Sequence, residues 1–368
     1  MENTEAFALR REKLLPALKS ARTNAFLATA LSNVRYLTGF TGSNAALLLT
    51  DERALLFTDP RYRTQASRES DCEIRIAKGP LSREIAIAVQ RLGLKSVAFE
   101  RNRIGFEEHQ ALTETLAGVR LRPLTGAVEA LRMVKSAAEI AAIQNSVRLN
   151  SLALDHALRH FKPSMSEIDL AAEIDYRMRR LGADGTAFDT IVASGERTAL
   201  PHAHPIARPI QGDRPGDQPG DQLLLIDMGA NVAGYASDMT RTFGLGKLDA
   251  KIRRMYKAVL ESQLAAIDAV KPGVSCAQVD RAARGVLRGY GFEKLFVHST
   301  GHGLGLEIHE RPRVGRKEAT KLEPGMAITI EPGVYQEGIG GVRIEDTVVV
   351  TTHGCEILTP TSKDLALL

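Results

Sequence analysis

A pattern of acids beside apolar runs occurs twice in the sequence and constrains the fold more than any other feature. Each copy has an apolar run, a turn with glycine and a second apolar run: LLLIDMGANVAGYASDMTRTF in the first and AITIEPGVYQEGIGGVRIEDTVVV in the second. Such runs, separated by turn residues, predict strand hairpins. The first hairpin carries Asp227 and Asp238, and the second carries Glu331 and Glu345. A carboxylate among core strand residues must be paired, protonated or bound to a cation.

The two hairpins belong to a weak internal repeat. FKPSMSEIDLAA, which begins at Phe161, resembles VKPGVSCAQVDRAA, which begins at Val270. Each stretch is a Lys-Pro turn, then a serine able to cap a helix, then a helix with an apolar-Asp pair. Each stretch also precedes one of the hairpins. We therefore expect two related halves packed face to face, with a site where their sheets meet.

Four acids in two similar halves are better explained by bound metal than by four separate buried polar groups. The stretch FVHSTGHGLGLEIHERP, residues 296–312, crowds His298, His302 and His309 among glycines. Four carboxylates and one imidazole, assigned to His302, make an oxygen-rich ligand set suited to two divalent cations. The glycines of GHGLG allow the backbone to approach the ions closely. Because the acids already fill the site, we expect His298 and His309 beside the ligands or facing a substrate.

A single histidine in a chain like this is usually a surface or core residue, so each remaining histidine needs a specific reason to be assigned a role. His202 and His204 lie in ASGERTALPHAHP, which follows the strand DTIVAS. Loops that follow strands often carry catalytic side chains. We favour His202 and leave the role of His204 open. No role is expected for four others: His109, His156, His160 and His353.

The length of 368 residues suits two domains of unequal size. Residues 1–125 alternate helical periods with short apolar runs such as NAALLLT, which predicts a small α/β domain. A long helical pattern then runs through VEALRMVKSAAEIAAIQNSVRLNSLALDHALRHF, so the second domain is expected at residues 126–368. The stretch from Ala207 to Gln222 repeats Gly-Asp between prolines, which predicts a solvated surface loop.

Composition excludes several classes of protein. The net charge is only +4 and the basic clusters lie beside acids on helical patterns, so nucleic acid is not an expected partner. Charges interrupt the first twenty residues where a signal peptide needs an apolar core, and no later window has about 18 uninterrupted apolar residues. The three cysteines are far apart and odd in number, which argues against a disulfide framework. We expect a cytoplasmic protein without a membrane anchor.

Four motifs together resemble the metallopeptidases of the pita-bread fold, specifically the Xaa-Pro peptidases (prolidase and aminopeptidase P): DMGANVAGYASDMTRTF, HSTGHGLGLEIHERP, EPGVY and GVRIED. NVRYLTGFTGSNAALLLT and LFTDPRYRTQA resemble the creatinase-type N-terminal domain of that family, so the resemblance covers nearly the whole chain. It implies an α/β (α+β) fold, with a small creatinase-like domain followed by a pita-bread domain of two similar halves.

The resemblance also assigns roles to single residues. It implies five metal ligands, with Asp238 and Glu345 bridging two ions: Asp227, Asp238, His302, Glu331 and Glu345. It implies that three histidines line the substrate pocket, steady the scissile carbonyl and help to move protons: His202, His298 and His309. Arg343 would buttress the ligand carboxylates and Tyr335 would line the pocket. Manganese suits the carboxylate-rich set, zinc or cobalt could occupy it, and the usual affinity order favours zinc.

The activity implied is hydrolysis of the Xaa-Pro imide bond, in dipeptides or at the N-terminus of longer peptides. Two cations that share a water lower its pKa and polarise the peptide carbonyl, and Glu331 would act as general base and later proton donor. The expected partners are a proline-containing peptide and a second copy of the chain in a homodimer. The choice between prolidase and aminopeptidase P stays open.

Three alternatives are weighed against this interpretation. A creatinase-like C–N hydrolase shares the fold but lacks the acidic ligands, and an inactive pita-bread binding module would likewise have lost ligands, whereas all five are present here. Methionine aminopeptidase keeps the ligands but lacks a creatinase-type N-terminal domain. The sequence therefore favours a metal-dependent Xaa-Pro peptidase.

Overall fold

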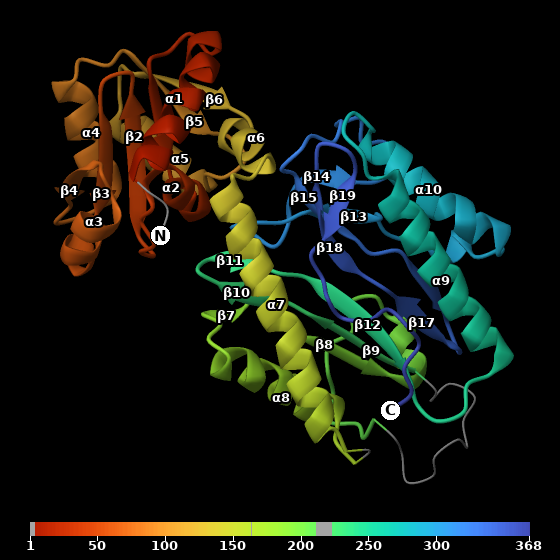
Figure 1. The fold of residues 1–368 in the computed structure, drawn as a ribbon. Helices are drawn as coiled ribbons and strands as arrows, with labels where there is room; N and C mark the ends of the chain where they lie inside the picture. The colour runs from red at the N-terminus through yellow and green to blue at the C-terminus, as the bar shows by residue number, and fades with distance from the viewer. Residues whose placement is uncertain (1–3, 163, 211–222) are drawn as a thin grey trace. The chain divides into compact units, whose positions relative to one another are not determined.

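The computed structural model describes residues 4–162, 164–210 and 223–368 (Figure 1). The chain divides into two compact units, Met1–Arg132 and Met133–Leu368. Most of the Gly-Asp repeat expected as a surface loop, residues 211–222, lies outside the described residues. In the described part of the chain, no helix is long and apolar enough to cross a membrane.

The N-terminal unit is built on one mixed sheet in the order β4-β3-β2-β1-β5-β6. Pairing is antiparallel for β1 with β2 and for β2 with β3, and parallel for the other neighbours. The apolar runs expected as strands form its centre, and every residue of β1 and β2 is buried. The elements are α1 (Thr4–Ser20), β1 (Ala25–Ala28), α2 (Leu31–Thr38), β2 (Ala45–Thr50), β3 (Ala54–Thr58), η1 (Pro60–Tyr62), α3 (Arg63–Glu69), β4 (Glu73–Ile76), α4 (Leu81–Arg91), β5 (Ser96–Glu100), α5 (Phe106–Thr115), β6 (Arg120–Leu124) and α6 (Ala127–Met133).

The long helical pattern expected from residue 128 onward is not one helix. It breaks between α6 and α7, where Val134 forms a bridge with Met326 and the backbone N–H of Lys135 donates to the carbonyl of Gly325. Ser136 then starts α7 through a capping box with Glu139. The break was missed because helical periodicity continues across it, while the competing backbone partners lie almost two hundred residues away in the sequence.

The first half of the C-terminal unit contains two helices, two strands and then four more strands that fold as one hairpin inside another. The outer strands β9 and β12 pair antiparallel, with Asp227 opposite Thr240, and the inner strands β10 and β11 also pair antiparallel. Two small sheets result, β12-β9-β8 and β11-β10-β7. The elements are α7 (Ala137–His160), α8 (Glu167–Arg180), β7 (Gly185–Thr186), β8 (Ile191–Ser194), η2 (Gly195–Ala199), β9 (Leu223–Met228), β10 (Ala230–Val232), β11 (Tyr235–Ala236) and β12 (Met239–Gly244).

The second half repeats this arrangement. The outer strands β15 and β18 pair antiparallel, with Ile330 opposite Asp346, and the inner strands β16 and β17 pair with each other. β15 and β18 belong to a sheet in the order β14-β13-β15-β18-β19. The elements are α9 (Ala250–Ala269), α10 (Cys276–Gly289), η3 (Glu293–Leu295), β13 (Gly301–Gly303), β14 (Glu310–Val314), β15 (Ala327–Ile330), β16 (Gly333–Gln336), β17 (Gly340–Arg343), β18 (Asp346–Val350) and β19 (Cys355–Ile357).

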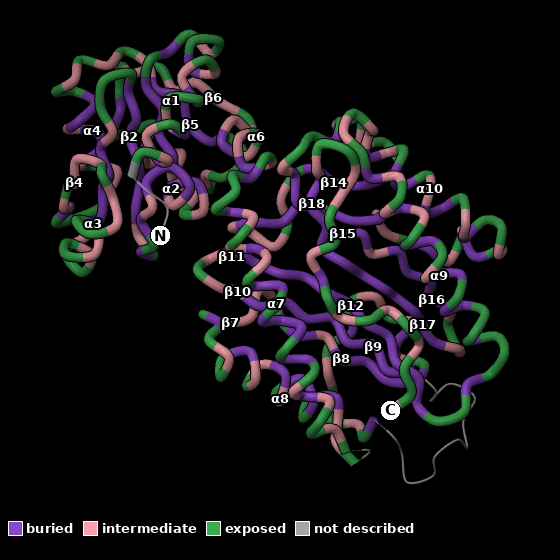
Figure 2. The backbone as a smooth tube through the Cα atoms, viewed as in Figure 1, coloured by how far each residue is buried: buried purple, intermediate pink, exposed green. Residues whose placement is uncertain are grey.

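The Lys-Pro repeats mark the same place in each half, the connection between two helices. Ser166 caps α8 and Ser275 caps α10, both through the expected capping box. The apolar faces of α7 and α8 pack on β8, β9 and β12, whereas α9 and α10 pack on strands of the second half. The strands between these helix pairs are buried (Figure 2). Polar side chains on the same strands are therefore held away from bulk water.

Candidate metal centre

The four expected acids lie at equivalent places of the two hairpins. Asp227 is near the end of β9 and Asp238 directly precedes β12, whereas Glu331 directly follows β15 and Glu345 directly precedes β18. Each acid therefore stands where an outer strand meets the inner pair. Because the two outer strands of each half pair with each other in register, the two acids of each half end close together.

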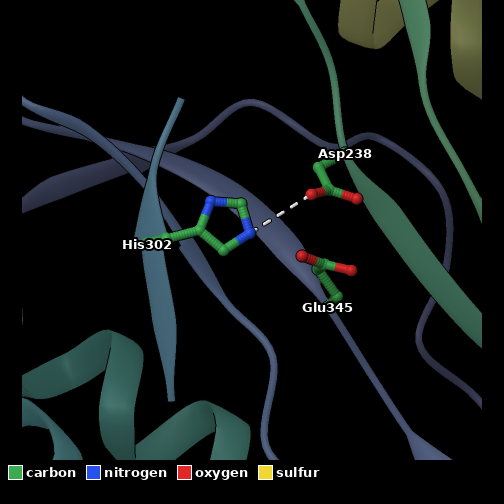
Figure 3. Close-up of side chains that lie close together, drawn as sticks. All are labelled: Asp238, His302 and Glu345. Atoms are coloured by element: carbon green, nitrogen blue, oxygen red, sulfur yellow. Dashed lines mark ion pairs between the residues drawn. The ribbon is translucent and has the colours of Figure 1, made fainter. Parts of the chain in front are cut away.

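Three of the expected ligands surround one point. Ligand atoms of Asp238, His302 and Glu345 all lie within 4.8 Å of one another. Figure 3 shows the imidazole of His302, from β13, pointing at both carboxylates. Its Nε2 lies 3.4 Å from Asp238 Oδ2 and 3.5 Å from Glu331 Oε1. The structure thus brings acids from both halves to one imidazole.

The orientation of His302 follows from its backbone surroundings. Its Nδ1 lies 3.0 Å from the carbonyl oxygen of Gly303, and since a carbonyl can only accept, Nδ1 carries the proton. Nε2 is then the nitrogen that faces the acids, as in metal-binding histidines. A side chain at Gly301 would overlap the carbonyl of Thr329, and one at Gly303 would overlap that of Arg311. Glycine here allows β13 to approach its neighbouring strands closely.

Asp227 is held by a chain of polar groups. Arg343 Nη2 donates to Asp227 Oδ2 at 2.7 Å, and Arg343 Nη1 donates to the hydroxyl of Tyr335 at 2.7 Å. That hydroxyl lies 2.8 Å from His298 Nε2. His298 Nδ1 is 2.8 Å from the carbonyl of Ser299 and must donate to it, so Tyr335 donates to Nε2. Arg343 therefore pairs with the carboxylate of Asp227, as expected of a buttress, and is linked through Tyr335 to a neutral His298.

Two threonines that sequence reasoning missed complete this network. Thr240 accepts from Arg343 Nε at 2.9 Å and donates to Glu345 Oε2 at 2.7 Å. Thr329 accepts from the backbone N–H of His302 at 3.1 Å and donates to Glu331 Oε1 at 3.3 Å. Strand periodicity could have found both, because each lies two residues from an expected ligand and faces the same side of its strand.

The pKa values of the ligands reflect crowded negative charge away from water. Burial raises the pKa of Asp238 to about 6 and that of Glu331 to about 7, and neighbouring carboxylates add to both effects. Burial and three neighbouring acids raise the pKa of Glu345 well above its ordinary value. Burial alone would lower the pKa of His302, but Asp238 and Glu331 raise it to about 9. A cation would relieve all of these carboxylates at once.

Two oxygens show directly that positive charge fits here. Asp227 Oδ1 and Glu345 Oε1 are buried and have no hydrogen-bond partner among the described residues. An unpaired buried carboxylate oxygen is costly and calls for a donor, a water or an ion. Both belong to expected ligands, and the donor set of carboxylate oxygens with one imidazole is suited to Mn²⁺, Zn²⁺ or Co²⁺. The residues present therefore fit divalent metal.

The other expected histidines lie beside this cluster. The ring of His309 is 4.4 Å from that of His302, between centroids, and His309 is exposed. Burial, then the charge of Arg343, lowers the pKa of His298 to about 4. Burial also lowers the pKa of His309, with charge on His302 and His202 adding to the effect. His202 is exposed in the loop after η2, and it helps to lower the pKa of both His298 and His309; His204 is also exposed.

Comparisons with known proteins agree with this geometry. Residues 141–352 match the model of Metallopeptidase family M24, and residues 10–134 match that of the Creatinase/Prolidase N-terminal domain. An Xaa-Pro dipeptidase of Pyrococcus horikoshii is 35% identical over 356 residues, which cover 96% of this chain and 97% of that protein.

Solved structures extend the likeness to the whole fold. An Xaa-Pro dipeptidase from Bacillus anthracis superimposes with a TM-score of 0.93 at 37% identity, covering 98% of this chain and 100% of that one. An X-Pro aminopeptidase from Thermotoga maritima gives a TM-score of 0.87 at 33% identity, covering 96% of this chain and 100% of that one. The resemblance and fold class expected from the motifs are confirmed. The chain belongs to metallopeptidase family M24 and carries the N-terminal domain shared by creatinases and prolidases.

Proposed function

We propose that this chain is a metal-dependent Xaa-Pro peptidase that hydrolyses the imide bond of dipeptides or of the first two residues of longer peptides. The observation that carries the proposal is the convergence of acids from both halves on His302, with two buried carboxylate oxygens unpaired among the described residues. Relatives similar over nearly the whole chain bear the names Xaa-Pro dipeptidase and X-Pro aminopeptidase.

Membership of a metallopeptidase family implies divalent metal. In our proposal two ions, manganese in the first instance, would be held by the five expected ligands: Asp227, Asp238, His302, Glu331 and Glu345. When bound, such ions lower the pKa of a water and polarise the scissile carbonyl. The retained acids argue against a creatinase-like C–N hydrolase and against an inactive binding module.

Glu331 is the proposed proton carrier. Its carboxylate is partly buried, and Oε1 lies 3.5 Å from His302 Nε2 and accepts a hydrogen bond from Thr329. The carboxylate would take a proton from the attacking water and return it to the proline nitrogen, which has no hydrogen of its own in an imide bond and must gain one to leave. A fixed carboxylate within reach of both water and nitrogen satisfies these two needs.

The histidines and Tyr335 would shape the pocket. His202 and His309 are exposed and are the proposed contacts to the substrate carbonyl and its tetrahedral intermediate. Both ring nitrogens of His298 already have partners, so its part is to line the pocket and to orient Tyr335. Arg343 holds Asp227 and Tyr335 in place, which keeps a ligand and the pocket wall in fixed relation.

The test is hydrolysis of Ala-Pro, Ala-Pro-Ala and Ala-Ala-Ala by metal-stripped protein resupplied with Mn²⁺, Zn²⁺ or Co²⁺ in turn. Cleavage of Ala-Pro alone would identify a dipeptidase, and cleavage of Ala-Pro-Ala an aminopeptidase P. Metal content measured on the same samples decides whether two ions bind. Absence of metal-dependent cleavage of any peptide would overturn the proposal and favour the binding module.

Further expectations from the sequence belong to the same proposal. The chain would act as a homodimer in a reducing cytoplasm, with residues 1–125 as the creatinase-type domain and residues 126–368 as the catalytic domain. The described cysteines, Cys72, Cys276 and Cys355, are free thiols, which suits such a compartment. Light scattering coupled to gel filtration tests the dimer, and a monomeric mass would contradict it.

A further inference from the structure

One buried carboxylate outside the metal cluster belongs to helix α8. Glu167 is the first residue of α8, and its side chain has no solvent exposure. Its Oε1 accepts from the backbone N–H and the hydroxyl of Ser194, at 2.8 and 2.9 Å. Its Oε2 accepts from Arg197 Nε and from the backbone N–H of Ile206, both at 3.2 Å. A buried carboxylate is stable when surrounded by donors in this way.

These donors are the two ends of one loop. Ser194 is the last residue of β8, and the chain passes from it through η2 to Ile206, carrying His202 on the way. The backbone of α8 closes the same end, since Glu167 N–H donates to the carbonyl of Arg208 and Ile168 N–H to that of Ile206. Glu167 therefore fixes where the loop leaves the strand and where it returns to the helix.

The middle of the loop contacts the second half of the unit. Gly341 N–H donates to Thr198 Oγ1 at 2.8 Å, and Arg343 Nη1 donates to the carbonyl of Pro201 at 3.2 Å. Arg197, paired with Glu167, also donates through Nη2 to the carbonyl of His204 at 2.6 Å. The residues beside His202 are thus tied to Arg343 of the metal network on one side and to Glu167 on the other.

We propose that Glu167 is a positioning residue for His202. Its carboxylate binds both ends of the loop that carries His202 and, through Arg197, the segment around His204, so that His202 faces the metal-binding cluster. The inference rests on the proposed peptidase function for its kinetic part only. A surface loop takes its position from such anchors. Loss of the anchor is expected to release the exposed imidazole of His202 from this position.

The test compares Glu167→Gln with a matched control on the same helix. Glutamine keeps the size of the side chain and one acceptor oxygen. It removes the negative charge that pairs with Arg197, and it places an NH₂ group among other donors. The control is Glu173→Gln, which removes a carboxylate paired with Arg177 on the partly exposed face of α8. Each change is made in the native chain and in a His202→Ala background, and kcat and KM are measured on Ala-Pro.

We expect Glu167→Gln to lower kcat/KM at least tenfold in the native chain and less than twofold in the His202→Ala background, with metal content unchanged. Glu173→Gln is expected to change neither. This non-additivity separates positioning from general damage, because a merely structural role lowers activity equally in both backgrounds. An equal fall in both backgrounds, or a native-chain effect below twofold, overturns the inference.

A readout without catalysis keeps the inference separate from the proposed function. Amide hydrogen exchange of peptides covering residues 194–206, measured on metal-free protein, is expected to accelerate at least tenfold in Glu167→Gln and to stay unchanged in Glu173→Gln. Unchanged exchange in both variants refutes the anchoring even if the enzyme is active. Accelerated exchange in a protein that cleaves no peptide supports the anchoring while the peptidase proposal fails.

Should Glu167→Gln fail to fold, Arg197→Met serves the same purpose. Arg197 is partly exposed, and its substitution removes only one of the donors to the Glu167 carboxylate. It is expected to lower kcat/KM at least threefold in the native chain and to have no further effect in the His202→Ala background. Equal losses in the two backgrounds would again count against the inference.

Discussion

Asp238→Asn is expected to have opposite effects on the metal-free and the metal-bound protein. Without metal, the carboxylate is buried among other acids and its pKa is raised from 3.8 to about 6. At pH 8 the carboxylate is charged in both the folded and the unfolded chain, so the cost of burying this charge destabilises the folded state. Each pKa unit corresponds to about 1.4 kcal/mol, so that cost is about 3 kcal/mol.

Asparagine has the same shape, carries no charge and can still accept from His302. We therefore expect the metal-free variant to be more stable than the metal-free native protein by up to about 3 kcal/mol. With about 2.1 cal/mol/K of unfolding entropy per residue, this raises Tm by about 4 °C. With metal, the sign reverses, because the variant has lost a proposed metal ligand and gains little from added Mn²⁺. Hydrolysis is abolished in this variant and in Asp238→Ala.

The assay is thermal unfolding at pH 8, followed by circular dichroism, of chelator-treated protein before and after addition of Mn²⁺. The control is Asp280→Asn, which removes a buried carboxylate paired with Arg284 at 2.8 Å and bonded to Thr300. It leaves a buried guanidinium without its carboxylate partner and costs about 3 kcal/mol with or without metal. A metal-free Asp238→Asn protein that melts at or below the native Tm would refute the account of the cluster as repelling charge. Normal metal content and turnover in the variant would refute its role as a ligand.

Three further predictions concern the same site. His309→Ala is expected to lower turnover about a hundredfold with metal retained; elemental analysis showing lost metal would instead make His309 a ligand. The metal-free protein is expected to lose stability as pH rises from 4 to 7. The folded pKa values of Asp238 and Glu331, about 6 and 7, exceed their unfolded values, so the folded chain binds more protons than the unfolded chain in this window. His298 and His309 have the opposite effect below pH 6.5, since burial lowers the folded pKa of both, to about 4 for His298. These two histidines are outweighed by the three raised carboxylates, Asp238, Glu331 and Glu345. Urea unfolding across this range measures the slope, and a rise in stability toward pH 7 would contradict it. Tyr335→Phe removes the hydroxyl that links His298 to the guanidinium of Arg343. It is expected to lower kcat/KM about tenfold, as loss of one hydrogen bond predicts. Steady-state kinetics at unchanged metal content checks this, and an unaltered kcat/KM would mean that the hydroxyl has no part in the reaction.

Local features of the fold were predictable from the sequence because they depend on neighbouring residues. Apolar runs between turn residues identified the strands of both hairpins, and the serines after the Lys-Pro turns identified the starts of α8 and α10. The break before α7 was not predictable, since Val134 and Lys135 are taken out of the helical pattern by distant backbone partners.

For the site, the sequence alone determined the residue types: two acids in each of two similar hairpins, and a glycine-flanked His302 beside further histidines. Only the tertiary structure decided which groups meet. Arg343 pairs with Asp227 and Thr240 bonds to Glu345 across more than a hundred residues of chain, and Glu167 gathers two ends of a loop that sequence reasoning did not connect. Burial and the distances between charges set the pKa values and the need for a cation, and both are properties of packing in space that adjacency along the chain does not encode.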